Sequence, residues 1–282
     1  MRRYLASAML LLVLLTSAAP QERFREIARR HRPTTDKVTT HAYDTMYDLF
    51  LGGAQRPLKL LEIGLGCDMV YGPGASARVW REFLPAGSEI WGAEVDAACV
   101  AKMQRNASLD IRYLVGDQAD PHTLRRWINE TGGGFDAIID DGGHSNLQIL
   151  TTFNALWYDA LKPGGIYFIE DLQVGRNLQL KQERESLARQ VPVVADVLHW
   201  WTEQLLVTRG LHKYAQPSKK LAPTAPGPAQ LLREPQWWTF PLGLKYIFCQ
   251  DEACALGRCR DPDTRFCRRK RRQRTPSTHT VR

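Results

Sequence analysis

Carboxylates and a histidine follow two apolar runs in the middle of the chain. One run ends in Asp140-Asp141-x-x-His144 and the other in Glu170-Asp171. If adjacent strands bring these acids to one edge, they repel one another unless they are protonated or bridged by a cation. Oxygen ligands favour a hard divalent ion such as Mg²⁺, and an imidazole with an ordinary pKa of about 6.5 suits a general base. The cluster indicates metal-assisted proton removal or, without metal, binding of an amine acceptor.

A purely structural interpretation of the same residues stays open. One acid of the Asp140-Asp141 pair would contact a cofactor, the other acids would cap helices, and His144 would cap or pack. Which interpretation holds depends on the elements that position these residues.

Apolar runs that end in acid or glycine alternate with helical segments along the chain. Such alternation predicts a parallel sheet with right-handed crossovers and helices on both faces. Two later runs, 237–240 and 244–248, are expected to form an antiparallel hairpin that closes the sheet. The expected strands lie within 60–68, 90–96, 111–117, 135–144 and 164–171, and the expected helices at 37–52, 75–83, 97–105, 121–129 and 146–161.

A glycine-spaced turn follows the first strand, where glycine allows a sharp turn and close approach to a ligand. Its acid-x-Gly-x-Gly pattern is followed, in order, by four further motifs at later strand ends. Together the five motifs resemble the class I S-adenosylmethionine-dependent methyltransferases. They are Glu62-x-Gly64-x-Gly66, Glu94-x-Asp96, Gly116-Asp117, Asp140-Asp141 and Lys162-Pro163-Gly164-Gly165. The resemblance implies an α/β fold with a Rossmann-like, mostly parallel seven-stranded sheet.

The resemblance also implies a cofactor site for S-adenosylmethionine. Its residues fall into groups at the amino acid end, the ribose and the adenine. Asp68 replaces the usual third glycine of the first motif, and Gly72 and Gly74 come later, so the loop is expected to be long. Ordinary helix capping is the alternative for Glu62 and Asp96. The implied contacts are Glu62, Gly64 and Gly66 at the amino acid end, Glu94 or Asp96 at the ribose, Asp117 with Gln118 at the adenine, and Asp140.

The acids at the fourth and fifth strand ends resemble those of the metal-dependent macrolide-sugar O-methyltransferases and the related cephalosporin-biosynthesis family. That resemblance implies that Asp140 or Asp141, with Glu170 and Asp171, holds Mg²⁺, and that His144, beside Asp141, is the catalytic base. The expected reaction is metal-assisted O-methylation of a small-molecule or sugar hydroxyl. The alternatives are N-methylation of an amine or peptide, and a non-catalytic secretory interaction protein.

The N-terminus predicts entry into the secretory pathway. Residues 1–19 combine a basic start, an apolar stretch and small residues, which is typical of a cleaved signal peptide or, alternatively, a retained membrane anchor. Two sequons begin at Asn106 and Asn129. Two disulfides are expected in the C-terminal part, whereas Cys67 and Cys99 are expected to be small buried side chains. The four C-terminal cysteines are Cys249, Cys254, Cys259 and Cys267. We therefore expect a secreted or luminal glycoprotein.

The net charge of +8 is confined to one end, because residues 257–282 hold ten Lys or Arg and two Asp. No aromatic residues alternate with these charges, so nucleic-acid binding is not indicated. The expected organisation after residues 1–19 is a linker at 20–36, a methyltransferase domain at 37–250, and a cysteine-containing, basic disordered tail at 251–282.

Overall fold

A seven-stranded sheet crosses the centre of the computed structural model, which describes residues 23–105, 109–208 and 235–261. The strand order is β3-β2-β1-β4-β5-β7-β6; the first five strands are parallel, and β7 and β6 pair antiparallel. This confirms the expected fold class. The strands are β1 (Lys59–Ile63), β2 (Glu89–Glu94), β3 (Arg112–Val115), β4 (Phe135–Asp140), β5 (Leu161–Ile169), β6 (Leu244–Gln250) and β7 (Ala253–Arg258).

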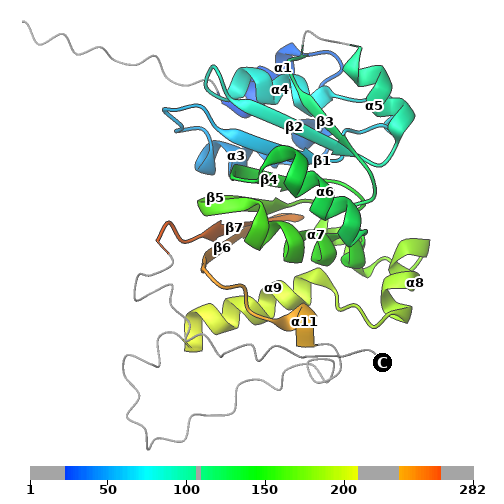
Figure 1. Ribbon diagram of the computed structural model, residues 1–282, viewed down its shortest axis with the longest axis vertical. Coiled ribbons are helices and arrows are strands. Elements are labelled where there is room, and N and C mark those ends of the chain that lie inside the picture. Colours follow the sequence, from blue (N-terminus) through cyan, green and yellow to red (C-terminus); the bar gives the residue numbers. More distant parts are fainter. Residues whose placement is uncertain (1–22, 106–108, 209–234, 262–282) are drawn as a thin grey trace, which may run out of the picture.

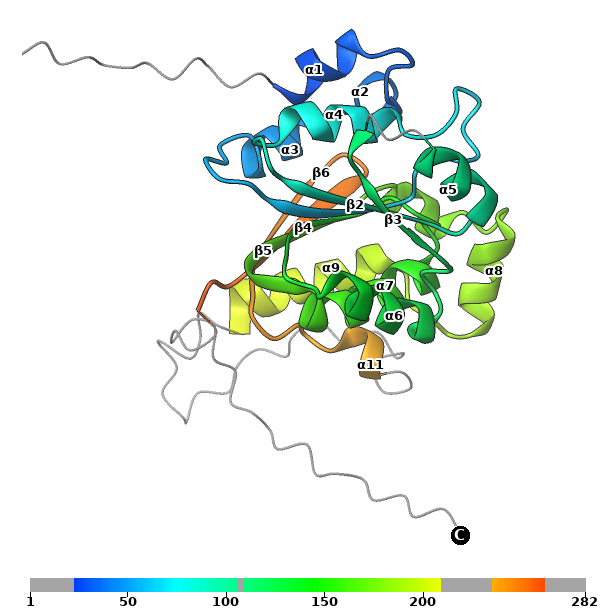
Figure 2. The same ribbon diagram turned by 45° about the horizontal axis from the view of Figure 1, so that its top comes forward.

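Helices cover both faces of the sheet (Figures 1 and 2). On one face lie α1 (Phe24–Arg30), α2 (Asp36–Thr39), α3 (Asp44–Phe50), α4 (Ala75–Phe83) and α5 (Ala97–Gln104). The other carries α6 (Pro121–Thr131), α7 (Asn146–Asp159), α9 (Val194–Glu203) and α11 (Pro235–Trp238). The remaining elements are η2 (Leu172–Arg176), α8 (Lys181–Ala188) and η3 (Gln204–Thr208). Among the described helices, none is both long and apolar enough to cross a bilayer.

Neighbouring residues of the central strands belong to two different hydrophobic cores. Leu61 and Ile138 pack with α6, α7 and α9, whereas Leu60 and Ile139 pack with α1, α3 and α4. This is the two-residue alternation of a strand that is buried on both sides. The same alternation directs consecutive side chains at the strand ends to opposite faces, which matters for the acids described below.

The predicted linker at 20–36 is wrong, because part of it belongs to the fold. Phe24 on α1 is fully buried, and its ring lies 4.7 Å from that of Trp80 and 4.8 Å from that of Tyr47. Burial of an aromatic side chain stabilises the fold by roughly 2 kcal/mol. Helix α1 is therefore a packed element of the domain. Residues 1–22, including the predicted signal segment, lie outside the described residues.

The C-terminal boundary also differs from the prediction. The first half of the expected strand at 237–240 belongs instead to the short helix α11. β6 pairs with β7, and β7 lies inside the predicted tail at 251–282. The domain therefore extends past residue 250. β7 follows β6 after a turn of only two residues, so the hairpin pairs 244–250 with 253–258 and not the two runs expected from the sequence. The basic residues from 262 onward lie outside the described residues.

Two disulfides join described cysteines. Cys249 pairs with Cys254 across the β6–β7 turn, in the C-terminal region where disulfides were expected. Cys67 pairs with Cys99, so the prediction of two free, buried thiols is wrong. Cys67 follows β1 and Cys99 follows β2, and these strands are adjacent and parallel, which brings the two residues together. Cys259 is also disulfide-bonded, and Cys267 lies outside the described residues.

Candidate active site

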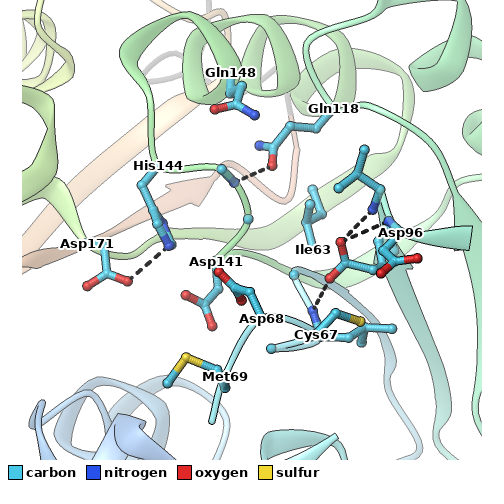
Figure 3. Close-up of a pocket in the computed structure, with 18 of the residues that line it drawn as sticks. Ile63, Cys67, Asp68, Met69, Asp96, Gln118, Asp141, His144, Gln148 and Asp171 are labelled. Carbon is cyan, nitrogen blue, oxygen red and sulfur yellow. Dashed lines mark hydrogen bonds and ion pairs between the residues drawn. The ribbon is translucent and has the colours of Figure 1, made fainter. Parts of the chain in front are cut away.

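A cavity of about 740 Å³ opens at the carboxyl ends of the parallel strands. Its walls come from the loops that follow β1 to β5, together with residues just before and on α2. In a parallel α/β sheet this edge is where ligands bind. Figure 3 shows side chains from these loops around the cavity. Of the predicted site residues, those that line it are Gly64, Gly66, Glu94, Asp96, Asp117, Gln118, Asp141, His144 and Asp171.

The glycine-spaced turn joins β1 to α4 by the long loop expected from the sequence. Gly64 has a positive φ of +90°, and a side chain there would overlap the carbonyl oxygen of Asp141. Gly64 therefore allows close contact between two loops of the site. Further along, Gly74 donates its N–H to the Leu65 carbonyl at 2.9 Å, and α4 begins at Ala75. The loop is fixed on itself and on the end of β4.

The two acids at the end of β2 accept hydrogen bonds from backbone N–H groups. Glu94 accepts from the N–H groups of Leu65, at 3.2 Å, and Val95, at 2.7 Å. It therefore connects the glycine turn to the loop after β2. Asp96 caps α5, accepting from Ala98 at 2.8 Å. Helix capping is thus present at Asp96, while the exposed Asp96 still lines the cavity.

Asp117 and Gln118 have different roles after β3. The exposed Asp117 accepts from the N–H of Ala119 at 2.8 Å and faces the cavity. Gln118 is buried; its Nε2 donates to Asp140 at 2.8 Å, and its Oε1 accepts from Gly143 N at 2.9 Å. Its amide therefore holds the loop after β4. Asp117 is the better placed of the two for a direct ligand contact.

Asp140 does not reach the cavity, which contradicts its predicted cofactor and metal roles. It is 1% exposed and accepts from Gln118 and from the Tyr167 hydroxyl, each at 2.8 Å. Burial raises the pKa of Asp140 to about 6, against the effect of these two hydrogen bonds. Strand alternation turns Asp140 toward the α6–α7 side and leaves the next residue, Asp141, at the cavity.

A buried lysine, which the sequence analysis did not identify, lies among three of the acids. The Nζ of Lys37 is 2.5 Å from Asp141, 2.6 Å from Glu170 and 3.5 Å from Glu62. Burial opposes the charge, but the carboxylates raise the pKa of Lys37 well above its ordinary value. Lys37 is therefore a fixed internal cation.

Glu62 and Glu170 are buried and do not line the cavity. Glu62 accepts from Ser76 and Trp80, both at 2.9 Å, so it anchors α4 instead of reaching a cofactor. One oxygen of Glu170 bonds Lys37, and Oε1 has no partner among the described residues. The structure therefore does not bring all four predicted metal ligands to one point.

Asp141, His144 and Asp171 do meet at the cavity. Each offers a ligand atom, and these atoms lie within 4.8 Å of one another. The Nε2 of His144 is 3.5 Å from Oδ2 of Asp171, and Nδ1 of His144 has no partner among the described residues. Figure 3 draws the contact between His144 and Asp171 as a dashed line. Two carboxylates beside an imidazole fit a divalent ion, with oxygen ligands suited to Mg²⁺.

Asp171 is held in its charged form. Burial acts to raise its pKa, but the neighbouring imidazole of His144 and hydrogen bonds from Gln173 and Tyr43 hold the pKa of Asp171 below its ordinary value. An anionic Asp171 can bind a cation or stabilise a charged imidazole beside it. The roles of Asp141, Asp171 and His144 as ligands and base stay predictions.

In sequence, the chain is similar to known O-methyltransferases over about half of its length. It is 33% identical over 149 residues to the 8-demethyl-8-alpha-L-rhamnosyl tetracenomycin-C 2'-O-methyltransferase of Streptomyces olivaceus, covering 52% of this chain and 37% of that protein. It is 35% identical over 159 residues to the demethylmacrocin O-methyltransferase of Streptomyces fradiae, covering 56% and 38%. The chain thus spans less than two fifths of the length of these relatives. No family model matches it.

Solved structures agree on the fold. The MycE methyltransferase of the mycinamycin biosynthetic pathway, solved with Mg and SAH, aligns with a TM-score of 0.60 at 22% identity. The alignment covers 86% of this chain and 56% of MycE. The chain has the Rossmann-like methyltransferase fold, and its resemblance to the macrolide-sugar O-methyltransferases is confirmed.

Proposed function

We propose that this protein is an S-adenosylmethionine-dependent methyltransferase that methylates a sugar hydroxyl on a small molecule with the help of a divalent ion. One observation carries the proposal. Asp141, His144 and Asp171 meet at the cavity edge, directly beside the loop that contains Gly64. This arrangement places a candidate base and candidate metal ligands next to a candidate cofactor loop.

The cavity residues divide into a cofactor part and an acceptor part. When bound, S-adenosylmethionine supplies an electrophilic methyl group. The backbone around Gly64 and Gly66 would enclose its amino acid end, Asp96 would accept from the ribose, and Asp117 would face the adenine. These residues would orient the cofactor for transfer of its methyl group.

The chemistry at the acceptor depends on charge and on proton removal. Asp141 and Asp171 would hold the divalent ion, which lowers the pKa of a hydroxyl bound beside it. His144 would accept the hydroxyl proton at Nε2, where Asp171, at 3.5 Å, stabilises the resulting imidazolium. The Nζ of Lys37, 2.5 Å from Oδ2 of Asp141, restrains this carboxylate.

The relatives support a sugar hydroxyl as the methyl acceptor. Their names describe methylation of a rhamnosyl group on tetracenomycin C and of L-olivosyl-oleandolide. The matches cover 52% and 46% of this chain. A deoxysugar carried on an apolar scaffold is the acceptor class that we propose.

We also propose that the protein matures in the secretory pathway. Two disulfides between described cysteines support an oxidising compartment, since such crosslinks are rare in the cytosol. Of the two sequons, Asn129 is exposed on α6, and Asn106 lies outside the described residues. In cells, glycosidase treatment and reduction should each change the migration of the mature chain. An unglycosylated cytosolic product without disulfides would contradict this assignment.

Calorimetry with S-adenosylhomocysteine, followed by a methyl-transfer assay, tests the proposed enzymatic function. The purified chain should bind this product and transfer the methyl group of S-adenosylmethionine to a rhamnosylated polyketide in the presence of Mg²⁺. The D96N variant should bind the product more weakly, whereas D120N, which alters the cap of α6 outside the cavity lining, should not. A wild-type protein that binds neither form of the cofactor would contradict the proposal.

A further inference from the structure

Asp171 lies between two histidines that come from distant parts of the chain. Its Oδ2 faces His144 at 3.5 Å, and its Oδ1 faces Nε2 of His41 at 3.7 Å. His144 belongs to the proposed active site, whereas His41 lies between α2 and α3 and does not line the cavity. The two oxygens of this carboxylate therefore have different environments, and what holds Oδ1 determines where Oδ2 points.

Tyr43 fixes both the side chain and the backbone of Asp171. Its hydroxyl donates to Oδ1 at 2.9 Å and accepts from the Asp171 N–H at 3.2 Å. Asp171 has a positive φ of +54°, a conformation that costs energy in a residue with a side chain. Tyr43 is 2% exposed and so forms a rigid support for this strained residue.

His41 packs against Tyr43, and Glu252 in turn contacts His41. The imidazole of His41 stacks on the Tyr43 ring, with centroids 4.7 Å apart and planes 10° from parallel. Nδ1 of His41 is 2.5 Å from Glu252. Glu252 lies in the β6–β7 turn, which the Cys249–Cys254 disulfide closes. The Glu252 carbonyl accepts from Leu172 N at 2.9 Å. The turn is thus attached to the segment that follows Asp171.

His41, Asp171 and Glu252 could be taken for a second metal site, because their ligand atoms lie within 4.8 Å of one another. Their hydrogen bonds argue against it. Glu252 already bonds His41 directly, and Oδ1 of Asp171 already accepts from Tyr43 and, at 2.8 Å, from Gln173. These groups have partners without an ion, so support of Asp171 is the interpretation that fits them better.

We propose that Tyr43, His41 and Glu252 are positioning residues that hold Oδ2 of Asp171 toward Asp141 and His144. Groups that hydrogen-bond a ligating carboxylate orient it and tune the affinity for the metal. The inference rests on the proposed function in one respect, namely that Asp171 binds the divalent ion. It adds a role for three residues outside the cavity, two from the α2–α3 region and one from the β6–β7 turn.

Titration of the full chain with Mn²⁺ alone, with no cofactor or acceptor present, tests the proposal. Y43F removes both hydrogen bonds to Asp171 and keeps the ring, so its Kd for Mn²⁺ should rise about tenfold. H41Q removes both the ring stacked on Tyr43 and the Nε2 that faces Asp171, and E252Q weakens the contact that holds His41, so each should raise the Kd by about threefold. The matched control is E82Q, which alters a His–Glu pair of similar length, His31–Glu82 at 2.7 Å, outside the cavity lining, and should leave the Kd unchanged.

The possible outcomes separate this inference from the proposed function. If the wild type binds one Mn²⁺ and all three variants bind it equally well, the positioning role is wrong and the proposed function stands. If E252Q loses one of two bound Mn²⁺ ions, the group is a second metal site and the positioning role is again wrong. If the wild type binds no Mn²⁺, the metal-assisted mechanism and this inference both fail. Glu252 is partly exposed, so E252Q remains informative even if Y43F fails to fold.

Discussion

The ammonium of Lys37 lies 2.6 Å from the carboxylate of Glu170, 133 positions away in the chain, and both side chains are buried. A second ion pair links Lys37 to Asp141. Helix α2 is therefore joined to the ends of β4 and β5 through one charged group. The segment before β1 is therefore part of the candidate site.

Replacing Lys37 with methionine should destabilise the protein by about 3–5 kcal/mol, because uncompensated buried carboxylates remain. Unfolding in urea measures this change. The double variant K37M/E170Q removes one of those acids and should recover part of the lost stability. A K37M protein as stable as the wild type would show that the buried ion pairs contribute nothing.

The edge of the sheet at which the acids meet could be predicted from the sequence, because parallel strands place their carboxyl ends together. Which acid of each pair faces the cavity could not be decided in advance. Asp140 and Glu170 turn inward, while Asp141 and Asp171 line the cavity. The choice follows from strand register, which depends on the neighbouring strands.

The residues that contact the acids of the site could not be predicted, because they are distant from these acids in the sequence and meet them only in the folded chain. Lys37, His41 and Tyr43 reach the acids from a segment that showed only helical spacing, and Glu252 comes from a turn in a predicted tail. The Cys67–Cys99 disulfide, in contrast, could have been predicted from the positions of its two cysteines in the sequence. Its cysteines follow the first two predicted strands, and consecutive strands of such sheets are usually neighbours.

The stability of the protein should depend on the ionisation of Asp140. Its pKa is raised to about 6 in the fold, so Asp140 stabilises the folded state below its ordinary pKa of about 3.8, and this contribution is lost as the pH rises through about 6. The difference in unfolding free energy between wild type and D140N should therefore fall by about 2–3 kcal/mol from pH 4 to pH 7. A pH-independent difference would contradict the raised pKa.

Loss of the Cys67–Cys99 disulfide should weaken both the fold and the cofactor site. This bond closes 32 residues of chain and ties the glycine turn to α5, so C67S/C99S should lose about 3–4 kcal/mol of stability. Its Kd for S-adenosylhomocysteine should rise about tenfold, because the loop must then be ordered on binding.

The C249S/C254S variant is the matched control for that experiment. Its disulfide spans 5 residues and lies away from the cavity lining, so the loss of stability should be smaller, about 2 kcal/mol, and the affinity for S-adenosylhomocysteine unchanged. Equal effects of the two variants on affinity would show that the Cys67–Cys99 bond has no specific role at the cofactor loop.

Gly64 and Gly72 allow a test of the contact between loops. They have similar positive φ values, +90° and +85°, but a Cβ on Gly64 would overlap the backbone of Asp141, whereas none of the described atoms lies within 4 Å of a Cβ on Gly72. G72A should cost about 1–2 kcal/mol, and G64A about 2–4 kcal/mol with weaker cofactor binding. Denaturant unfolding and calorimetry measure both, and equal costs would contradict the close contact.

Single-turnover methyl transfer to a rhamnosylated acceptor tests the central claim most directly. The wild type should react with Mg²⁺, stop in excess chelator and recover when Mg²⁺ is restored. D171N should bind S-adenosylmethionine normally but lose activity, and H144A should slow transfer by about 10² to 10⁴ while it still binds the metal. Full transfer in excess chelator, or an H144A protein as fast as the wild type, would contradict the assignment of Asp141, His144 and Asp171 as a metal-assisted catalytic group.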